Sequence, residues 1–149
     1  MSSEKKRVNM QSLHGKLCVS LYEQFGERVL PIIAKTYGEY GYDLGCGLKK
    51  KWNPKDFEEI GMSFMKMCND AGLPTTVHLE GNTAYWEGKK CPFGLENSQR
   101  KVCEAMMEMD LEMMRALTGV EKGKIRMTID QTVAAGDPVC KGTYTLIKE

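Results

Sequence analysis

Apolar residues recur every four positions near the start of the chain, a spacing that places side chains on one face of an α-helix. The spacing predicts a helix over residues 10–24 and a second helix over residues 27–40, with Pro31 in its first turn. Three glycines then predict the end of the second helix and a flexible turn over residues 44–51. The apolar positions of the first helix are Leu13, Leu17, Leu21 and Phe25.

A third helix is predicted after this turn. Asn53 is expected to cap it, Pro54 to occupy its first position and Asp56 to lie where negative charge is favoured. Cys68 falls on its apolar face, so the simplest interpretation of this cysteine is a core residue. The other residues of that face are Phe57, Ile60, Phe64, Met67 and Ala71.

β-Branched and alternating residues predict two hairpins with a helix between them. The first hairpin joins residues 75–80 to residues 83–86 through Gly81-Asn82, and the second joins residues 124–133 to residues 139–148. Successive strand residues point to opposite faces, so Tyr85 and Trp86 are expected to divide between the core and an opening. Helices combined with antiparallel hairpins, without a repeating strand–helix–strand pattern, favour an α+β fold. We therefore expect N-terminal helices packed on an antiparallel sheet, in one domain spanning residues 1–149.

The helix between the hairpins, predicted over residues 98–117, has three kinds of side-chain row. An apolar stripe and a charged face are separated by a boundary row that includes a carboxylate. Because Cys103 and Asp110 lie on the same row, they are expected to face the same region. The apolar stripe is Val102, Met106, Met109, Met113 and Leu117, and the boundary row is Cys103, Met107, Asp110 and Met114.

Charge and hydropathy exclude several classes of partner. Lys and Arg number 21 against 20 Asp and Glu, which argues against nucleic acid or an anionic membrane surface. Residues 1–9 are polar and predict a frayed lead-in without a signal peptide, and no apolar run approaches the ~20 residues of a membrane span. A cytoplasmic location is expected, where disulfides seldom persist.

Six cysteines in such a protein require another explanation, and three of them lie at the edges of predicted elements. Cys91 lies in a proline-containing turn, Cys103 in the first turns of a helix, and Cys140 directly after a turn. If folding brings them together, they are candidate ligands for zinc, with an iron–sulfur cluster as a minor alternative. Inert burial is the competing explanation. The candidate fourth ligands are Asp130, Asp137, His78 and a water molecule.

Two segments resemble a known family. Val102-Cys103-Glu104 through Thr118-Gly119, and Thr132 through Gly136-Asp137-Pro138-Val139-Cys140, are similar to the vinyl-reductase-type (hydrocarbon-binding) domain and to the related L-2-amino-thiazoline-4-carboxylic acid hydrolases. The first of these domains also forms the sensor of certain aromatic-responsive transcription activators. The resemblance covers roughly residues 85–147.

The resemblance implies a small-molecule site, a zinc ion and often a homodimer. In the sensors, zinc is held by cysteines at the positions of Cys103 and Cys140 and by a Glu/Cys pair on the intervening strand. In this chain Ile129 and Thr132 occupy the positions of that pair, and Cys91, together with Asp130, could supply a substitute.

Three functions remain open from the sequence. The first is a module that binds a small, partly apolar molecule, in a pocket expected to be lined by Trp86, Met107, Met114 and Tyr144. The second is a metal-dependent hydrolase of a cyclic C–N bond, with Asp110 as the acid or base. The third is a cysteine nucleophile, which needs a nearby base, and no motif ties His14 or His78 to a cysteine.

Overall fold

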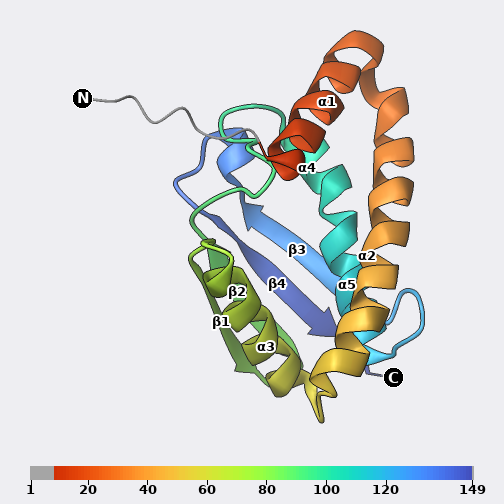
Figure 1. Ribbon diagram of the computed structural model, residues 1–149, viewed down its shortest axis with the longest axis vertical. Coiled ribbons are helices and arrows are strands. Elements are labelled where there is room, and N and C mark those ends of the chain that lie inside the picture. Colours follow the sequence, from red (N-terminus) through yellow and green to blue (C-terminus); the bar gives the residue numbers. More distant parts are fainter. Residues whose placement is uncertain (1–8, 149) are drawn as a thin grey trace.

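A four-stranded antiparallel sheet forms the base of the molecule and carries helices on one face (Figure 1). The computed structural model describes residues 9–148, so all but the last residue of the polar segment 1–9 lies outside it. The strand order is β1-β2-β4-β3, which joins the two predicted hairpins through β2 and β4. The strands are β1 (Thr75–Glu80), β2 (Thr83–Gly88), β3 (Ile125–Gln131) and β4 (Cys140–Leu146).

The helices form two layers above this sheet. In Figure 1, α3 lies over β1 and β2, α5 lies over β3 and β4, and the long α2 packs on the outer side of α5. No helix within residues 9–148 is long and apolar enough to cross a membrane. The helices are α1 (Met10–Phe25), α2 (Leu30–Trp52), α3 (Phe57–Asp70), α4 (Arg100–Met106) and α5 (Glu108–Thr118), with 3-10 turns η1 (Gly26–Val29) and η2 (Val133–Ala135).

The strand alternation sorts side chains between a covered and an open face. Trp86 pairs with Val77 and Gly142 and faces the helices, whereas Tyr85 is exposed on the other face and stacks on His78 at 5.0 Å. The open face, which carries Tyr85, is polar and includes the hydrogen-bonded pair Thr128–Thr143. The predicted α+β fold, with a helical segment between two hairpins, is confirmed.

The second helix does not end where its glycines predict. It continues to Trp52, and the prediction of a flexible turn over residues 44–51 is wrong. A Cβ atom on Gly41 would clash with the Met109 carbonyl oxygen, and one on Gly45 would lie 2.5 Å from the Met113 carbonyl oxygen. These glycines therefore allow two helix backbones to approach closely, and this packing outweighs their weak helix propensity.

The start of the third helix also differs from the prediction. Asn53 is not its cap but ends α2 in the left-handed conformation, with φ of 46°. The cap is Asp56, whose carboxylate accepts a hydrogen bond from the backbone N–H of Glu59 at 2.8 Å. The hydrogen bond satisfies a backbone N–H of the first turn that has no partner within the helix, which explains why aspartate occupies the N-cap position.

The helix predicted over residues 98–117 is divided at Met107 into α4 and α5. The backbone N–H of Asp110 bonds the Met107 carbonyl at 3.0 Å, a three-residue spacing that tightens the helix locally. The turn separates the start of the segment, which carries Cys103, from the methionine-rich α5.

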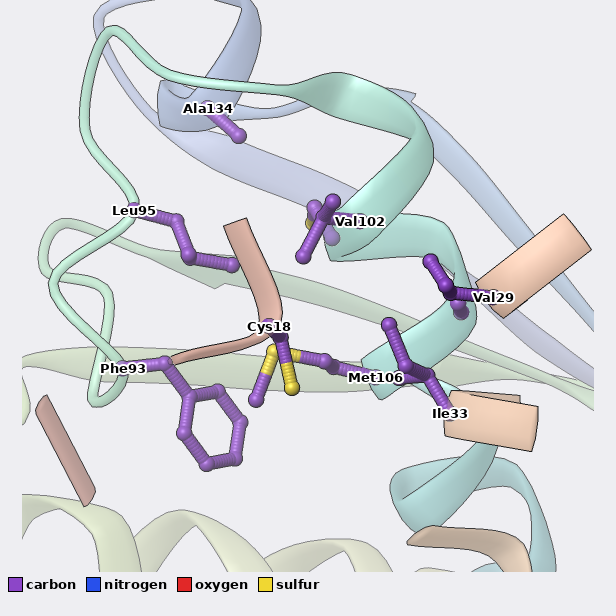
Figure 2. Packing of buried hydrophobic residues seen from close by; sticks show 10 residues of the cluster. Cys18, Val29, Ile33, Phe93, Leu95, Val102, Met106 and Ala134 are labelled. Atoms are coloured by element: carbon purple, nitrogen blue, oxygen red, sulfur yellow. The ribbon is translucent and has the colours of Figure 1, made fainter. Parts of the chain in front are cut away.

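Two buried clusters lie at opposite ends of this helical segment. Figure 2 shows the first cluster, in which Phe93, Leu95 and Met106 converge from the β2–α4 loop and α4 near Cys18 of α1. The second cluster joins α5 and α3 to the sheet and includes Met114 and Tyr144. The candidate site lies where the first cluster meets the sheet.

Candidate functional site

A cavity of about 110 Å³ lies between α3, the α4–α5 turn, the β2–α4 loop and the covered face of the sheet. Its wall is mostly apolar, with four thiols, one carboxylate and one indole N–H among the chemically distinctive groups. The lining residues are Phe64, Cys68, Leu73, Thr75, Trp86, Gly88, Lys90, Cys91, Pro92, Phe93, Leu95, Cys103, Met106, Met107, Met109, Asp110, Ile129, Thr132 and Cys140.

The three cysteines singled out in the sequence all line this cavity. The hydroxyl of Thr132 lies between two of them, 3.3 Å from the sulfur of Cys103 and 3.9 Å from that of Cys140. Thr132 itself is 1% exposed. The convergence of a turn, a helix start and a strand start is therefore a feature of the fold.

The turn before β4 is held by Asp137. Its carboxylate accepts a hydrogen bond from the backbone N–H of Thr132 at 2.9 Å, and the backbone N–H of Val133 donates to the Cys140 sulfur at 3.4 Å. Asp137 therefore has the turn-forming role that its Gly-Asp-Pro context indicates. It is not a member of the cavity wall.

Burial favours the neutral form of Cys103 and of Cys91 by raising the pKa of each thiol. Burial raises the pKa of Cys103 to about 11, against a smaller lowering by its hydrogen bond with Thr132. Burial likewise raises the pKa of Cys91, although backbone N–H groups of Leu95 and Phe93 oppose the rise. Since the thiolate is the reactive and metal-binding form, these thiols are weak nucleophiles and weak ligands at neutral pH.

The residues present do not fit the zinc site that the resemblance implies. No three Cys, His, Asp or Glu side chains within residues 9–148 form a group placed to hold a metal ion. At the position of the family's glutamate ligand this chain has the apolar Ile129. At the position of the family's cysteine ligand on the same strand it has the buried hydroxyl of Thr132. Of the alternative fourth ligands, Asp130 and His78 are exposed on the open face of the sheet.

The polar side of the cavity is formed by Asp110, at the start of α5. Its carboxylate forms no hydrogen bond or ion pair with a described residue, and burial raises its pKa from 3.8 to about 6. Burial raises the pKa of Cys68 and of Tyr144, and the charge of the nearby Asp110 adds to the rise in both. The half-buried Asp110 is a cavity carboxylate without a partner in the described part of the chain.

Trp86 supplies a second unpaired polar group. Its indole nitrogen Nε1 is buried and has no hydrogen-bond partner in the described part of the chain, although the ring lines the cavity. Its ring centroid lies 6.2 Å from that of Tyr144. A buried N–H donor without an acceptor is costly, so an acceptor atom that a ligand brought within reach of Nε1 would be favoured.

Two of the four residues expected to line the pocket do not reach it. Trp86 and Met107 do line it, but Met114 and Tyr144 are 2% and 3% exposed within the second buried cluster. The expectation that Met114 and Tyr144 line the cavity is wrong because the helix descends onto the sheet beyond Asp110. Neither histidine lines the cavity, so the cysteine-nucleophile interpretation gains no imidazole base.

The cavity wall also includes two residues, Cys68 and Thr132, that the sequence did not predict there. Cys68, interpreted as a core residue, is half-buried and faces the cavity from α3. Thr132 was noted only as a replaced ligand, yet its hydroxyl organises the cysteine side of the cavity. Its position directly after an alternating strand and before a Gly-Asp-Pro turn was the available signal.

Similar folds occur in two solved structures of ligand-bound proteins. The phenol-responsive sensory domain of the transcription activator PoxR, solved with phenol, matches with a TM-score of 0.65 and 17% identity over 93% of this chain and 75% of that chain. Trafficking protein particle complex subunit 3 from Naegleria fowleri, covalently bound to palmitic acid, matches with a TM-score of 0.63 and 13% identity over 93% of this chain and 95% of that chain.

These likenesses show a shared fold. No family model matches the chain, and no curated protein sequence matches it either.

Proposed function

We propose that this protein binds a small, partly apolar molecule in the cavity beneath the α4–α5 turn. The observation that carries the proposal is a mostly apolar cavity lined by Asp110 and Trp86, whose carboxylate and indole N–H have no partner within residues 9–148. Ligand sites typically combine an apolar lining with a few such groups. The bound phenol and palmitic acid named for the two similar folds support the same proposal.

The size of the cavity favours a one-ring ligand. Its volume of about 110 Å³ is of the same order as an engineered apolar cavity of about 150 Å³ that binds benzene. A long acyl chain like that of palmitic acid fits this volume less well. Met106, Met107 and Met109 on the wall have flexible side chains that can adapt to ligands of somewhat different shape.

Binding can be followed through Trp86. In a Trp52→Phe background Trp86 is the remaining tryptophan, and titration with phenol should give a saturable change in its fluorescence. Leu73→Trp, in the turn between α3 and β1, should fill the cavity and abolish saturation, as followed by protein-observed NMR. Leu13→Trp, at a 45% exposed position on α1, is the matched control and should leave binding unchanged. No saturation with any one-ring probe would contradict the proposal.

A hydrolase acting on a cyclic C–N bond is the second candidate, and one observation favours it. A carboxyl group with a pKa of about 6 is close to the ideal for a general base at neutral pH, and Asp110 borders a cavity large enough for a small ring. Incubation with cyclic amidines and chromatography of the products tests it. Ring opening that is lost in Asp110→Asn would support the enzyme, whereas binding without turnover would support the module.

The homodimer and the cytoplasmic location expected from the sequence remain predictions. Light scattering coupled to size-exclusion chromatography would determine the first.

A further inference from the structure

The charged groups of the cavity wall are Asp110 and Lys90. Asp110 is the acidic residue among the lining residues, and its carboxylate has no ion-pair partner in residues 9–148. Lys90, the basic residue of the wall, is exposed and forms no ion pair with it within 4.0 Å. A carboxylate in apolar surroundings is costly unless it is paired with a positive charge or a hydrogen-bond donor.

The groups around Asp110 do not supply that pairing. Cys68 of α3 and Tyr144 of β4 are close enough to sense its charge, but burial keeps both in their neutral forms. Cys91 and Cys103 on the far wall are neutral as well, with pKa values raised by burial. Residues 9–148 therefore leave the Asp110 carboxylate free to pair with a group of the ligand.

We propose that the cavity selects small ring compounds bearing a protonated amine, and that the Asp110 carboxylate is the group that pairs with this amine. The inference deepens the proposed binding function and rests on it. An N⁺–H···O⁻ hydrogen bond is stronger than a neutral one, and a low-dielectric wall strengthens it further. A ligand carboxylate, in contrast, would place like charges together in an apolar cavity.

Trp86 adds a second requirement. Its buried Nε1–H needs an acceptor, and a protonated amine has none. An amine that also carries a hydroxyl or ether oxygen would pair both groups and is the fullest match to the wall. Phe64 and the indole ring of Trp86 would contact the ring of such a molecule.

Three probes of similar shape and different charge test the proposal. Benzylamine is cationic at pH 7.5, benzyl alcohol is neutral and benzoate is anionic. We expect benzylamine to bind about tenfold or more tightly than benzyl alcohol, since hydrogen bonds to charged groups contribute more than neutral ones, and benzoate not to saturate. Isothermal titration calorimetry measures all three.

Substitutions separate the two polar groups. Asp110→Asn should remove the preference for benzylamine, whereas Asp130→Asn, an exposed aspartate on the open face of the sheet, should leave it intact. Trp86→Phe should weaken benzyl alcohol more than benzylamine, because the alcohol oxygen accepts from Nε1.

If Asp110→Asn does not fold, the pH dependence of benzylamine affinity in the unsubstituted protein tests the same proposal. Lowering the pH from 7.5 to 5 should weaken benzylamine binding about tenfold, since the Asp110 carboxyl has a pKa of about 6 and takes up a proton in this range. Titrations near pH 6 in two buffers of different ionisation enthalpy should show proton release on binding.

Equal affinities for benzylamine and benzyl alcohol, unchanged by Asp110→Asn or by pH, would overturn this inference and leave the binding function standing. Failure of all three probes to bind would overturn the binding function, and the inference with it.

Discussion

The two ends of the α4–α5 segment have the same kind of sequence and different surroundings. At one end the row Cys103, Met107 and Asp110 borders a cavity, and at the other end Met114, one turn beyond Asp110, is 2% exposed in solid packing. The row is continuous in the sequence. The difference shows that helical spacing indicates which side chains lie on the same side of a helix. The neighbouring elements determine whether that side faces a cavity or packed side chains.

The contact between α2 and α5 holds both ends in place, so breaking it should have the largest effect. Gly41→Leu would drive a side chain into the backbone at Met109, and we expect destabilisation of about 3 kcal/mol or more. Urea denaturation followed by circular dichroism measures it. Gly47→Ala, on the same helix with open space around it, should be neutral or stabilise by up to about 1 kcal/mol. Equal effects of the two substitutions would contradict close packing at Gly41.

A pair of methionine truncations compares the two ends directly. Met114→Ala should cost about 2–5 kcal/mol of unfolding free energy, because it leaves a void in a filled core. Met107→Ala should cost less than half as much, since the half-buried Met107 already borders empty space. Chemical denaturation of both variants under one set of conditions is the measurement. A larger loss for Met107→Ala would show that the cavity end is packed as tightly as the other.

Asp110 makes the cavity end sensitive to pH. Its folded-state pKa of about 6 lies above the unfolded value near 3.8, so the protonated group stabilises the fold. This stability is fully present below about pH 3.8 and is lost as the pH rises through 6. This difference between the folded and unfolded pKa values corresponds to about 2–3 kcal/mol of unfolding free energy. Asp110→Asn should therefore stabilise the protein at pH 7.5 and flatten the dependence of its unfolding free energy between pH 4 and 7. An unchanged pH profile would contradict an unpaired carboxylate.

The cysteine side of the cavity lacks both ligands of the strand pair in the zinc site implied by the resemblance, because Ile129 and Thr132 stand in their places. The protein purified without added metal should carry no stoichiometric zinc, as measured by elemental analysis. Thr132→Cys places a thiol where the hydroxyl now lies between Cys103 and Cys140, and we expect it to gain cobalt absorption bands of thiolate coordination with little change in stability. Stoichiometric zinc in the unsubstituted protein, lost in Cys103→Ser, would reverse this conclusion.

Local patterns predicted most of the elements correctly. β-Branched residues and a Gly-Asn turn located the first hairpin, alternation located the second, and apolar faces at helical spacing located the helices. Cys91, Cys103 and Cys140, predicted at element edges, line one cavity but form no group within residues 9–148 that could hold a metal ion. The end of α2 was not predicted because Gly41 and Gly45 can either end a helix or allow close packing, and their contacts with α5 select the second. The start of α3 was not predicted because Asn53 can cap either helix, and it ends α2.

The sequence by itself determined an α+β fold and a helical row in which a thiol and a carboxylate face one side. Only the tertiary structure decided that this side is a cavity, that Met114 lies outside it, and that Cys68 and Thr132 belong to it. The physical reason is that periodicity is a property of one element, whereas unfilled volume and desolvation depend on every element that surrounds it. The unpaired Asp110 carboxylate and the Trp86 N–H acquire their significance from that enclosure alone.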